Sequence, residues 1–453
     1  MRAYKYRLHP TPEQEARLSA WVAAVRAVYN AALTQREWYG RAVGTDPHGR
    51  DSRFNSVRQS REIGTRKLSG DEELEWITDA PADAFGNALR DLDKAFKNFF
   101  AGRAGYPSYR RYGLNDSLTL PAFKVGKRMR RGWQMNVVFG KDAVRLPKIG
   151  RVRYRKHKKH LGKAKTVTVS RAAGQWYVSV ACEIEIVDPV RNNAPNVGID
   201  LGITRPLTLS TGDYVDRDRG LVRLDARKRR LQRELARCKR GSNRRHRRKA
   251  KMARVARKIA NRRTARCHRI TTSLVRNFGG IAIEDLKVKN MTASAKGDAD
   301  NPGKNVKAKA GLNREMLNVA PFEIRRQLEY KAEAAGIPVI AVPPAYTSQT
   351  CSRCGAVDAE SRIDQATFAC TSCGTRLNAD LNAAINIESK AFGSASVVGR
   401  RNAPSESSCG SATQNPIVSP FAGLEHSDFS ASNLWFYAAD QRTTHHQVRR
   451  PEI

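Results

Sequence analysis

The sequence predicts a multidomain α+β protein with a helical lobe, a small β-barrel and an α/β domain that carries a zinc-ribbon insert. Three observations lead to this fold class. Apolar residues recur at helical spacing near the N-terminus, they alternate with polar residues between 117 and 185, and two C-x-x-C pairs lie between 351 and 373. With 453 residues, the chain is long enough for two to four domains.

The first ten residues are expected to form a strand, because Tyr4, Tyr6 and Leu8 alternate with the cations Lys5 and Arg7. A helix is predicted after it. Its start is a capping box of the type T-P-E-Q at 11–14, with Pro at the first helical position.

A second apolar helical stripe begins after Pro81 and runs to Phe100. The segment 44–70 between the two helical regions is polar and is expected to be rich in loops. Arg110 and Arg111 lie in the basic loop that follows the second stripe. Residues 11–113 are therefore expected to be mainly helical.

Short strands are predicted from 117 to 185, where the hydrophobic period changes to two. Several such strands separated by Gly, Pro and basic turns are typical of a small β-barrel. One of the turns holds Lys156, Lys158 and Lys159 and is basic enough to bind phosphates.

An apolar strand with an acid, Asp200, follows at 196–203, and a second strand follows at 206–210. This is the pattern of the first hairpin of an RNase H-like domain. The sequence V-G-I-D-L-G alone is shared with sugar kinases and actin-like ATPases, so it does not decide between them. A carboxylate in such a strand is costly to bury unless a cation neutralises it.

Residues 226–270 hold 21 Lys and Arg against the single acid Glu234. A solvated charged helix is the alternative interpretation, but a helix with so little counter-charge repels itself. A bound phosphate backbone is therefore the favoured interpretation.

Two more acids lie at the ends of elements that could belong to one α/β sheet. A short apolar strand ends in Glu284 with Asp285 beside it, and side-chain alternation allows only one of the two to face a site, for which we choose Glu284. Asp380 opens a helix-like run to Ile387. Together with Asp200, these acids could hold two Mg²⁺ ions about 4 Å apart for phosphodiester hydrolysis.

The two C-x-x-C pairs are Cys351 with Cys354 and Cys370 with Cys373, with fifteen residues between the pairs. This spacing predicts one structural Zn²⁺ held by four thiolates. A redox pair is the alternative. The remaining cysteines show no paired spacing and fit a reducing compartment.

The formal charge of +39 implies a polyanionic partner, nucleic acid before membrane. No signal peptide and no apolar run of about eighteen residues is present, which predicts a cytoplasmic protein without membrane contact. The candidate nucleic-acid contacts are Lys5, Arg7, Arg110, Arg111, Lys156, Lys158, Lys159, Arg229, Arg230, Arg244, Arg245, Arg247 and Arg248.

With these motifs in this order, the chain resembles TnpB, the RNA-guided DNA endonuclease of small bacterial transposons, which is similar to compact type V CRISPR nucleases. The resemblance covers residues 1 to about 390. It rests on Y-K-Y-R-L at 4–8, L-D-K-A-F-K-N-F-F at 92–100, G-I-D-L-G at 198–202, I-E-D-L at 283–286, L-E-Y-K-A at 328–332, Y-T-S-Q-T-C at 346–351 and the run 380–387.

The resemblance implies that Asp200, Glu284 and Asp380 are the three acids of a RuvC-like nuclease of RNase H fold. It also implies a guide RNA made partly from the transposon end, a double-stranded DNA target and, we expect, a protein monomer bound to the RNA in a bacterial cytoplasm. The implied layout is a first strand of the wedge barrel at 1–10, a recognition domain at 11–113, the wedge barrel at 114–190, the nuclease domain at 196–345 with basic helices at 217–277, a zinc-ribbon target-nucleic-acid-binding insert at 346–376 and the last nuclease segment at 377–393. The tail at 394–453 carries no such motif and, from its Ser, Asn, Thr and Gly content, is expected to be largely disordered.

One departure from the family is visible. Many relatives carry Asp-Arg-Asp where this chain has Asn378-Ala379-Asp380, so the last acid is kept and an auxiliary charge is lost. Two alternatives remain beside the transposon nuclease: a CRISPR effector of the same kind, and a guided DNA-binding protein that no longer cuts. A DNA-joining transposase would need neither the ribbon nor the barrel.

Overall fold

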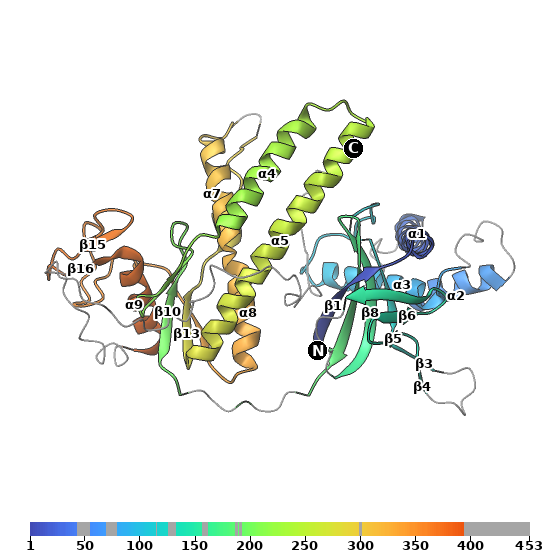
Figure 1. Cartoon of the computed structure of the whole chain (residues 1–453), viewed down its shortest axis with the longest axis horizontal. Helices are drawn as coiled ribbons and strands as arrows, with labels where there is room; N and C mark the ends of the chain where they lie inside the picture. The colour runs from blue at the N-terminus through green and yellow to red at the C-terminus, as the bar shows by residue number, and fades with distance from the viewer. Residues whose placement is uncertain are drawn as a thin grey trace. The chain divides into compact units, whose positions relative to one another are not determined.

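The structure, a computed structural model, describes residues 1–42, 55–68, 79–114, 116–125, 133–155, 162–185, 189, 193–298 and 301–393 (Figure 1). The described residues form two compact units, one up to Glu185 and one after it. The predicted phosphate-binding turn with Lys156, Lys158 and Lys159, and the predicted tail from 394 onward, lie outside the described residues.

The first unit is built on a seven-stranded antiparallel sheet in the order β2-β8-β9-β1-β7-β6-β5. Its strands are β1 (Arg2–His9), β2 (Ser117–Pro121), β5 (Val138–Phe139), β6 (Ala143–Leu146), β7 (Gly150–Arg155), β8 (Lys163–Ala172) and β9 (Gln175–Glu183). The described residues contain no pairing between β2 and β5 that closes this sheet into the expected barrel. A separate hairpin joins β3 (Phe123–Val125) to β4 (Trp133–Met135).

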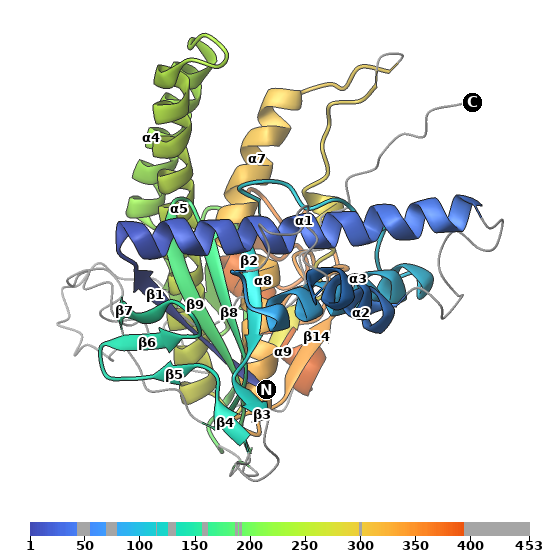
Figure 2. The ribbon, with the colours of Figure 1, turned by 90° about the vertical axis from the view of Figure 1, so that its right-hand side faces the viewer.

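Two helices cover this sheet, α1 (Pro12–Ala42) and α3 (Ala82–Phe100) (Figure 2). The predicted capping box is present, since Thr11 N donates to Gln14 Oε1 at 3.1 Å and Gln14 N donates to Thr11 Oγ1 at 3.3 Å. The apolar stripes of both helices share one core with Tyr4, Tyr6 and Leu8 of β1. The two predicted helical stripes are thereby confirmed.

The loop expected at 44–70 is wrong in part, because Ser56–Leu68 forms helix α2. Asn55 caps it by accepting from Val57 N and Arg58 N. Among the residues of α2 whose burial is described, the two buried ones, Ser56 and Gln59, are polar. Gln59 donates to Ala32 O at 3.0 Å and accepts from Arg36. Hydrogen bonds to α1 therefore hold α2 in place. The helix was not predicted because its sequence lacks a clear apolar stripe.

The second unit contains a five-stranded sheet in the order β12-β11-β10-β13-β14. These strands are β10 (Asn196–Asp200), β11 (Leu207–Leu209), β12 (Tyr214–Val215), β13 (Gly280–Glu284) and β14 (Val339–Val342). β12, β11 and β10 are antiparallel neighbours, whereas β10, β13 and β14 run parallel. The predicted strands around Asp200 and Glu284 are thus confirmed as neighbours in one sheet.

Helices cover both faces of this sheet (Figure 1). On one face, α5 (Asn243–Asn277) and α8 (Pro321–Glu333) pack on Val197, Ile199, Ile281 and Ile283. On the other face lies α9 (Ala379–Phe392). The close approach of α9 to β10 requires glycine at position 198, where a Cβ would lie 2.1 Å from Ala384 O.

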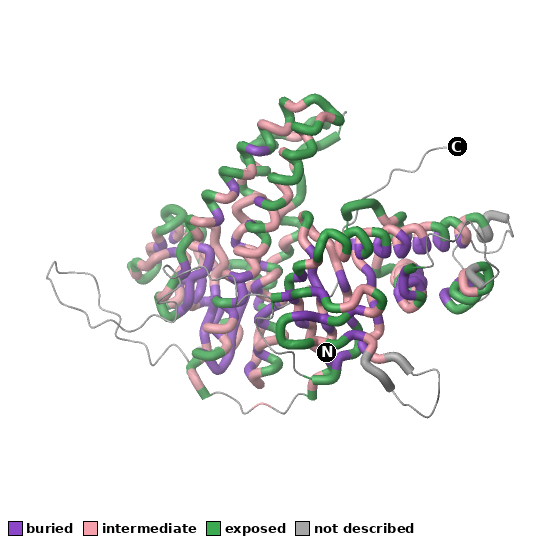
Figure 3. Tube along the Cα trace, turned by 45° about the vertical axis from the view of Figure 1, so that its right-hand side comes forward, coloured by how far each residue is buried: buried purple, intermediate pink, exposed green. Residues whose placement is uncertain are grey.

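A long helical hairpin, α4 (Arg219–Ala236) followed by α5, carries the basic segment. Asp218 caps α4 and Ser242 caps α5 with their side-chain oxygens. A small apolar seam of Leu221, Leu231, Val255 and Ile259 joins the two helices. The tip of the hairpin, residues 236–251, is mostly exposed, in contrast to the buried strands (Figure 3).

Three helices and a small ribbon complete the second unit. The apolar residues between Leu312 and Gly336 recur at helical spacing and predict a single helix. The chain instead forms α7 (Val306–Val319) and α8, separated at Ala320, whose φ of 61° is left-handed. The short α6 (Val288–Met291) follows β13, and β15 (Thr367–Ala369) pairs with β16 (Arg376–Asn378) just before α9.

Candidate active site and metal centre

Asp200 and Glu284 lie at the carboxyl ends of adjacent parallel strands. Val197 and Ile199 of β10 and Ile281 and Ile283 of β13 face α5 and α8, and the register pairs Ile199 with Ile283. Side chains alternate along a strand, so the next residue on each strand, the acid, faces α9 instead. The neighbour Asp285 forms an ion pair with Arg325 of α8.

Asp380 joins them from the first turn of α9. The side chain of Asn378 caps this helix by accepting from Asp380 N at 3.1 Å and Leu381 N at 3.3 Å. Free N–H groups at a helix start favour a negative charge there. All three acids therefore belong to the same side of the sheet.

The three acids are near enough to influence one another's pKa, although their carboxylate oxygens do not all lie within 4.8 Å of one another. Burial raises the pKa of Asp200 to about 7, and the negative charges of Glu284 and Asp380 contribute to that rise. Burial also raises the pKa of Glu284 and that of Asp380. Partly desolvated carboxylates that repel one another are the donor set that a divalent cation stabilises.

Two residues near the acids, Thr347 and Arg362, were not among the predicted site residues. Thr347, which is 3% exposed, donates its hydroxyl to Glu284 Oε1 at 2.6 Å. Arg362 lies close enough that its positive charge partly opposes the rise in the pKa of Asp200 and of Asp380. Both belong to the segment around the cysteines, and only the fold brings that segment back to the sheet.

The four cysteines form the tightest group of potential metal ligands. Among the described residues, theirs is the only set of three or more such atoms within 4.8 Å of one another. Cys351 Sγ lies 3.7 Å from Cys373 Sγ, and Cys354 Sγ lies 3.6 Å from Cys370 Sγ. Four sulfurs at about 2.3 Å from a central Zn²⁺ are roughly 3.8 Å apart, so these residues fit tetrahedral zinc.

Hydrogen bonds also prepare two of these sulfurs for metal binding. The Thr375 hydroxyl and N–H lower the pKa of Cys373 to about 6. The N–H of Cys373 lowers the pKa of Cys370. Thiolates are the form that binds zinc.

Asparagines of α9 tie the cysteine segment to the acid site. Asn382 Nδ2 donates to Thr350 O at 2.8 Å and Asn382 Oδ1 accepts from Ser352 N at 2.9 Å. Asn386 Nδ2 donates to Thr347 O at 2.9 Å. The first cysteine knuckle, α9 and Glu284 are therefore joined by direct hydrogen bonds.

The predicted nucleic-acid contacts fall into two groups. Arg7, Arg111, Arg229, Arg230, Arg244 and Arg247 are exposed, and of these Arg230 also pairs with Glu234 at 3.6 Å. Others have structural partners: Arg110 lies 4.0 Å from the Tyr29 ring, Lys5 lies 4.9 Å from the Tyr177 ring, Arg245 donates to Leu235 O, and Arg248 pairs with Glu234 at 2.7 Å.

In the described part of the chain, no helix is both long and apolar enough to cross a membrane.

Three family models match the chain. A helix-turn-helix domain of the OrfB IS605 group matches residues 1–42, where the structure has β1 and the single helix α1. A model of the same group described as "Probable transposase" matches residues 179–295. A Cas12f1-like TNB domain matches residues 322–387, a range that includes the cysteine cluster.

Proteins that are similar over most of this chain are found in bacteria. InsQ of Escherichia coli K12, named as an RNA-guided DNA endonuclease, is 37% identical over 85% of this chain and 91% of its own length. A protein of Streptomyces pristinaespiralis with the same kind of name is 33% identical over 85% and 88%. Among solved structures, a Cas12f1–sgRNA–target DNA complex is 14% identical with a TM-score of 0.48 and covers 83% of this chain and 82% of that one.

Proposed function

The chain belongs to the TnpB family, the OrfB proteins of IS605-type transposons, and from that premise we propose that it is an RNA-guided endonuclease for double-stranded DNA. It hydrolyses the DNA next to a short flanking motif. The observation that carries the proposal is the placement of Asp200, Glu284 and Asp380 on one side of one sheet, with a raised pKa at Asp200.

These three acids would hold two Mg²⁺ ions, because carboxylate oxygens are the ligands that this hard cation prefers. Bound Mg²⁺ supplies an activated water and stabilises the leaving oxygen of a phosphodiester. The chain's own residues do the rest: the Thr347 hydroxyl orients Glu284, and the Arg362 guanidinium offers a positive charge beside the acids for a DNA phosphate. Cys351, Cys354, Cys370 and Cys373 would hold one Zn²⁺.

The finer domain layout is part of the proposal. The order β12-β11-β10-β13-β14, with an antiparallel hairpin next to parallel strands, supports a RuvC-like nuclease of RNase H fold at 196–345 and 377–393. The ribbon at 346–376 is the target-nucleic-acid-binding insert. The seven-stranded sheet (1–10 and 114–190) serves as the wedge domain and α1 to α3 (11–113) as the recognition lobe.

The net positive charge and the family membership together suggest the binding partners, a guide RNA and a DNA target. A guide RNA from the transposon end binds basic surfaces such as the α4–α5 hairpin and pairs with the target strand. The protein acts as a monomer on that RNA in the bacterial cytoplasm. A CRISPR effector would share all of these residues and would differ by a neighbouring repeat array.

Cleavage of a plasmid library with randomised flanks tests the proposal. The protein is co-expressed with its downstream transposon-end RNA and assayed in Mg²⁺. We expect cuts at guide-matched sites next to one motif, and a loss of at least about 100-fold in Asp200→Ala and Glu284→Gln. Asp285→Asn is the matched control and keeps cleavage, because Asp285 faces Arg325. Guide-dependent binding without cutting would favour the binding-only alternative.

A further inference from the structure

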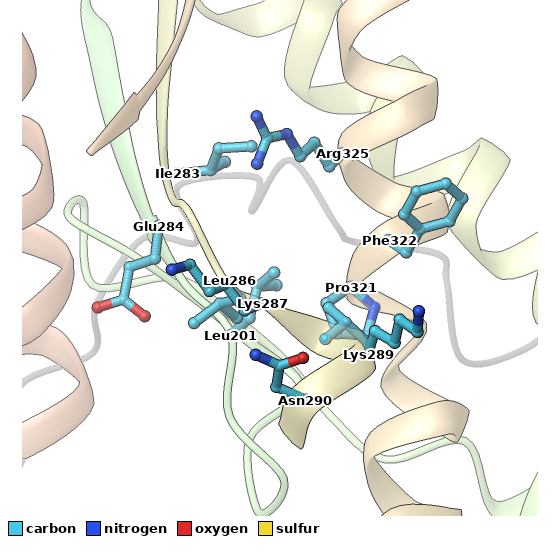
Figure 4. Close-up of a pocket in the computed structure, with 11 residues that line it drawn as sticks. Leu201, Ile283, Glu284, Leu286, Lys287, Lys289, Asn290, Pro321, Phe322 and Arg325 are labelled. Carbon is cyan, nitrogen blue, oxygen red and sulfur yellow. The ribbon is translucent and has the colours of Figure 1, made fainter. Parts of the chain in front are cut away.

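A pocket of about 420 Å³ lies beside Glu284, between the end of β13, α6 and the start of α8. Figure 4 shows Phe322 and Lys289 on the α8 side of this pocket and Glu284 on the opposite side. Glu284 therefore forms a boundary between the pocket and the acid site. A strand of DNA bound at the acids would pass this boundary.

The pocket joins an apolar lining to a cationic rim. Leu201, Ile283, Leu286 and Pro321 contribute the apolar lining, and Lys287, Lys289 and Arg325 contribute the cations. Arg325 is already neutralised, because it pairs with Asp285 and with Glu329 at 3.0 Å. Lys287 and Lys289 are exposed and form no ion pair within the described chain. The positive charge available to a ligand thus comes from the two lysines.

Phe322 gives the pocket an aromatic surface. Its side chain is 67% exposed, although it lies in the first turn of α8, where Pro321 and Ile324 beside it are buried. An exposed ring that borders an apolar pocket offers a π-face for stacking.

Hydrogen bonds from α7 hold α6, which forms one side of the pocket, in place. Lys309 Nζ donates to Met291 O at 2.7 Å, and Asn313 Nδ2 donates to Thr292 O at 2.9 Å. These bonds from α7 fix the C-terminal end of α6, on which Lys289 lies. The pocket is therefore largely formed before a ligand arrives.

We propose that this pocket holds one nucleotide of the single-stranded DNA next to the phosphodiester that is cut. Its base stacks on Phe322 against the apolar lining, and its phosphate is bound by Lys287 and Lys289. The inference rests on the proposed function, since it takes the acid site to act on DNA. The volume lies within the range of about 300–1,000 Å³ of small-ligand pockets, and stacking accepts every base.

The decisive measurement is the fluorescence of 2-aminopurine placed at successive positions of a pre-unwound target strand. The guide complex is formed with Ca²⁺ in place of Mg²⁺, so that binding is observed without cutting. We expect quenching at one position next to the cut site in the wild type, no quenching there in Phe322→Ala, and restored quenching in Phe322→Trp. Leu317→Ala, which removes an apolar side chain 47% exposed on α7, is the control and keeps the quenching.

A kinetic arm in Mg²⁺ uses the same strands with one abasic site. In the wild type, loss of the base at that position raises KM about tenfold. Phe322→Ala has this higher KM on the intact strand and on the abasic strand alike. Lys287→Ala with Lys289→Ala raises KM and lowers its salt dependence, and the control pair Lys304→Ala with Lys307→Ala changes neither.

The outcomes separate the two proposals. Cleavage with quenching that does not depend on Phe322 overturns the nucleotide pocket and leaves the nuclease. Phe322-dependent quenching without cleavage in Mg²⁺ supports the pocket and overturns the nuclease. If Phe322→Ala instead weakens binding of the guide RNA alone, the pocket belongs to RNA and the inference is wrong.

Discussion

At the scale of single residues, the burial of an ionised Asp200 beside two other acids destabilises the metal-free fold. The folded protein holds the Asp200 proton far more tightly than an unfolded chain does, because the pKa rises from 3.8 to about 7. Ionisation of Asp200 therefore destabilises the metal-free fold as the pH rises through this interval, and below it the cost is absent.

Asp200→Asn removes this cost and is expected to stabilise the metal-free protein. At pH 8 we expect a free energy of unfolding higher by about 1–3 kcal/mol, and at pH 4 a difference near zero. Denaturant unfolding in EDTA-treated buffer at both pH values measures it, with Asp285→Asn as the control. A variant less stable than the wild type at pH 8 would mean that the acids do not repel one another.

The sequence indicated the acids because Asp200 and Glu284 lie on apolar strands and Asp380 opens a helix-like run, and strand alternation separated Glu284 from Asp285. Thr347 and Arg362 could not be found in the same way. Their importance depends on how the cysteine segment folds back onto α9, and neither periodicity nor spacing encodes that path.

At the scale of elements, the zinc ribbon and the sheet form one hydrogen-bonded assembly. Asn386 holds the backbone of Thr347, and Thr347 holds Glu284. Metal binding to the four cysteines would stabilise the segment that contains Thr347, so a zinc ion held there would act on the acid site from outside it.

Loss of zinc is therefore expected to reduce cleavage as well as local order. Cys354→Ser should lose the metal, become sensitive to protease within 346–376 and cut at least about tenfold more slowly. Cys238→Ser, at a cysteine outside the cluster, is the control. Metal content, limited proteolysis and guided cleavage are compared. Normal cleavage in a zinc-free variant would show that the ribbon does not position Glu284.

Apolar periodicity predicted α1, α3 and the strands, but it failed at two elements. α2 is fixed by the buried amide of Gln59, which carries no hydrophobic signal. The break between α7 and α8 falls at Ala320 in a left-handed conformation that alanine rarely adopts. Local helix propensity favours a continuous helix there, but the tertiary structure interrupts the helix at Ala320.

At the scale of the whole molecule, the net charge of +39 is distributed unevenly, and the α4–α5 hairpin carries a dense share of it. The sequence predicted this basic segment and its partner class. It did not reveal which arginines are used within the fold, because Arg245 and Arg248 look the same as Arg244 and Arg247 in the chain.

Nucleic-acid binding should separate these two kinds of arginine. Arg244→Ala with Arg247→Ala is expected to reduce the slope of log affinity against log salt by about two, with little effect on melting temperature. Arg248→Ala should mainly lower the melting temperature, because it removes the closer ion pair of Glu234, at 2.7 Å, and leaves only the pair with Arg230 at 3.6 Å. Guide-RNA affinity at several salt concentrations and thermal unfolding test this. Equal salt slopes for all variants would place the RNA elsewhere.

The position of α9 at the end of the described chain has a consequence for incomplete products of translation. A polypeptide that stops before Ala379 lacks the third acid and also the helix that covers Gly198, Ala282 and Val342. Its central sheet would expose an apolar face, and cellular proteases remove such chains. A nonsense mutation upstream of α9 is therefore expected to leave no stable protein that competes with the intact one for RNA.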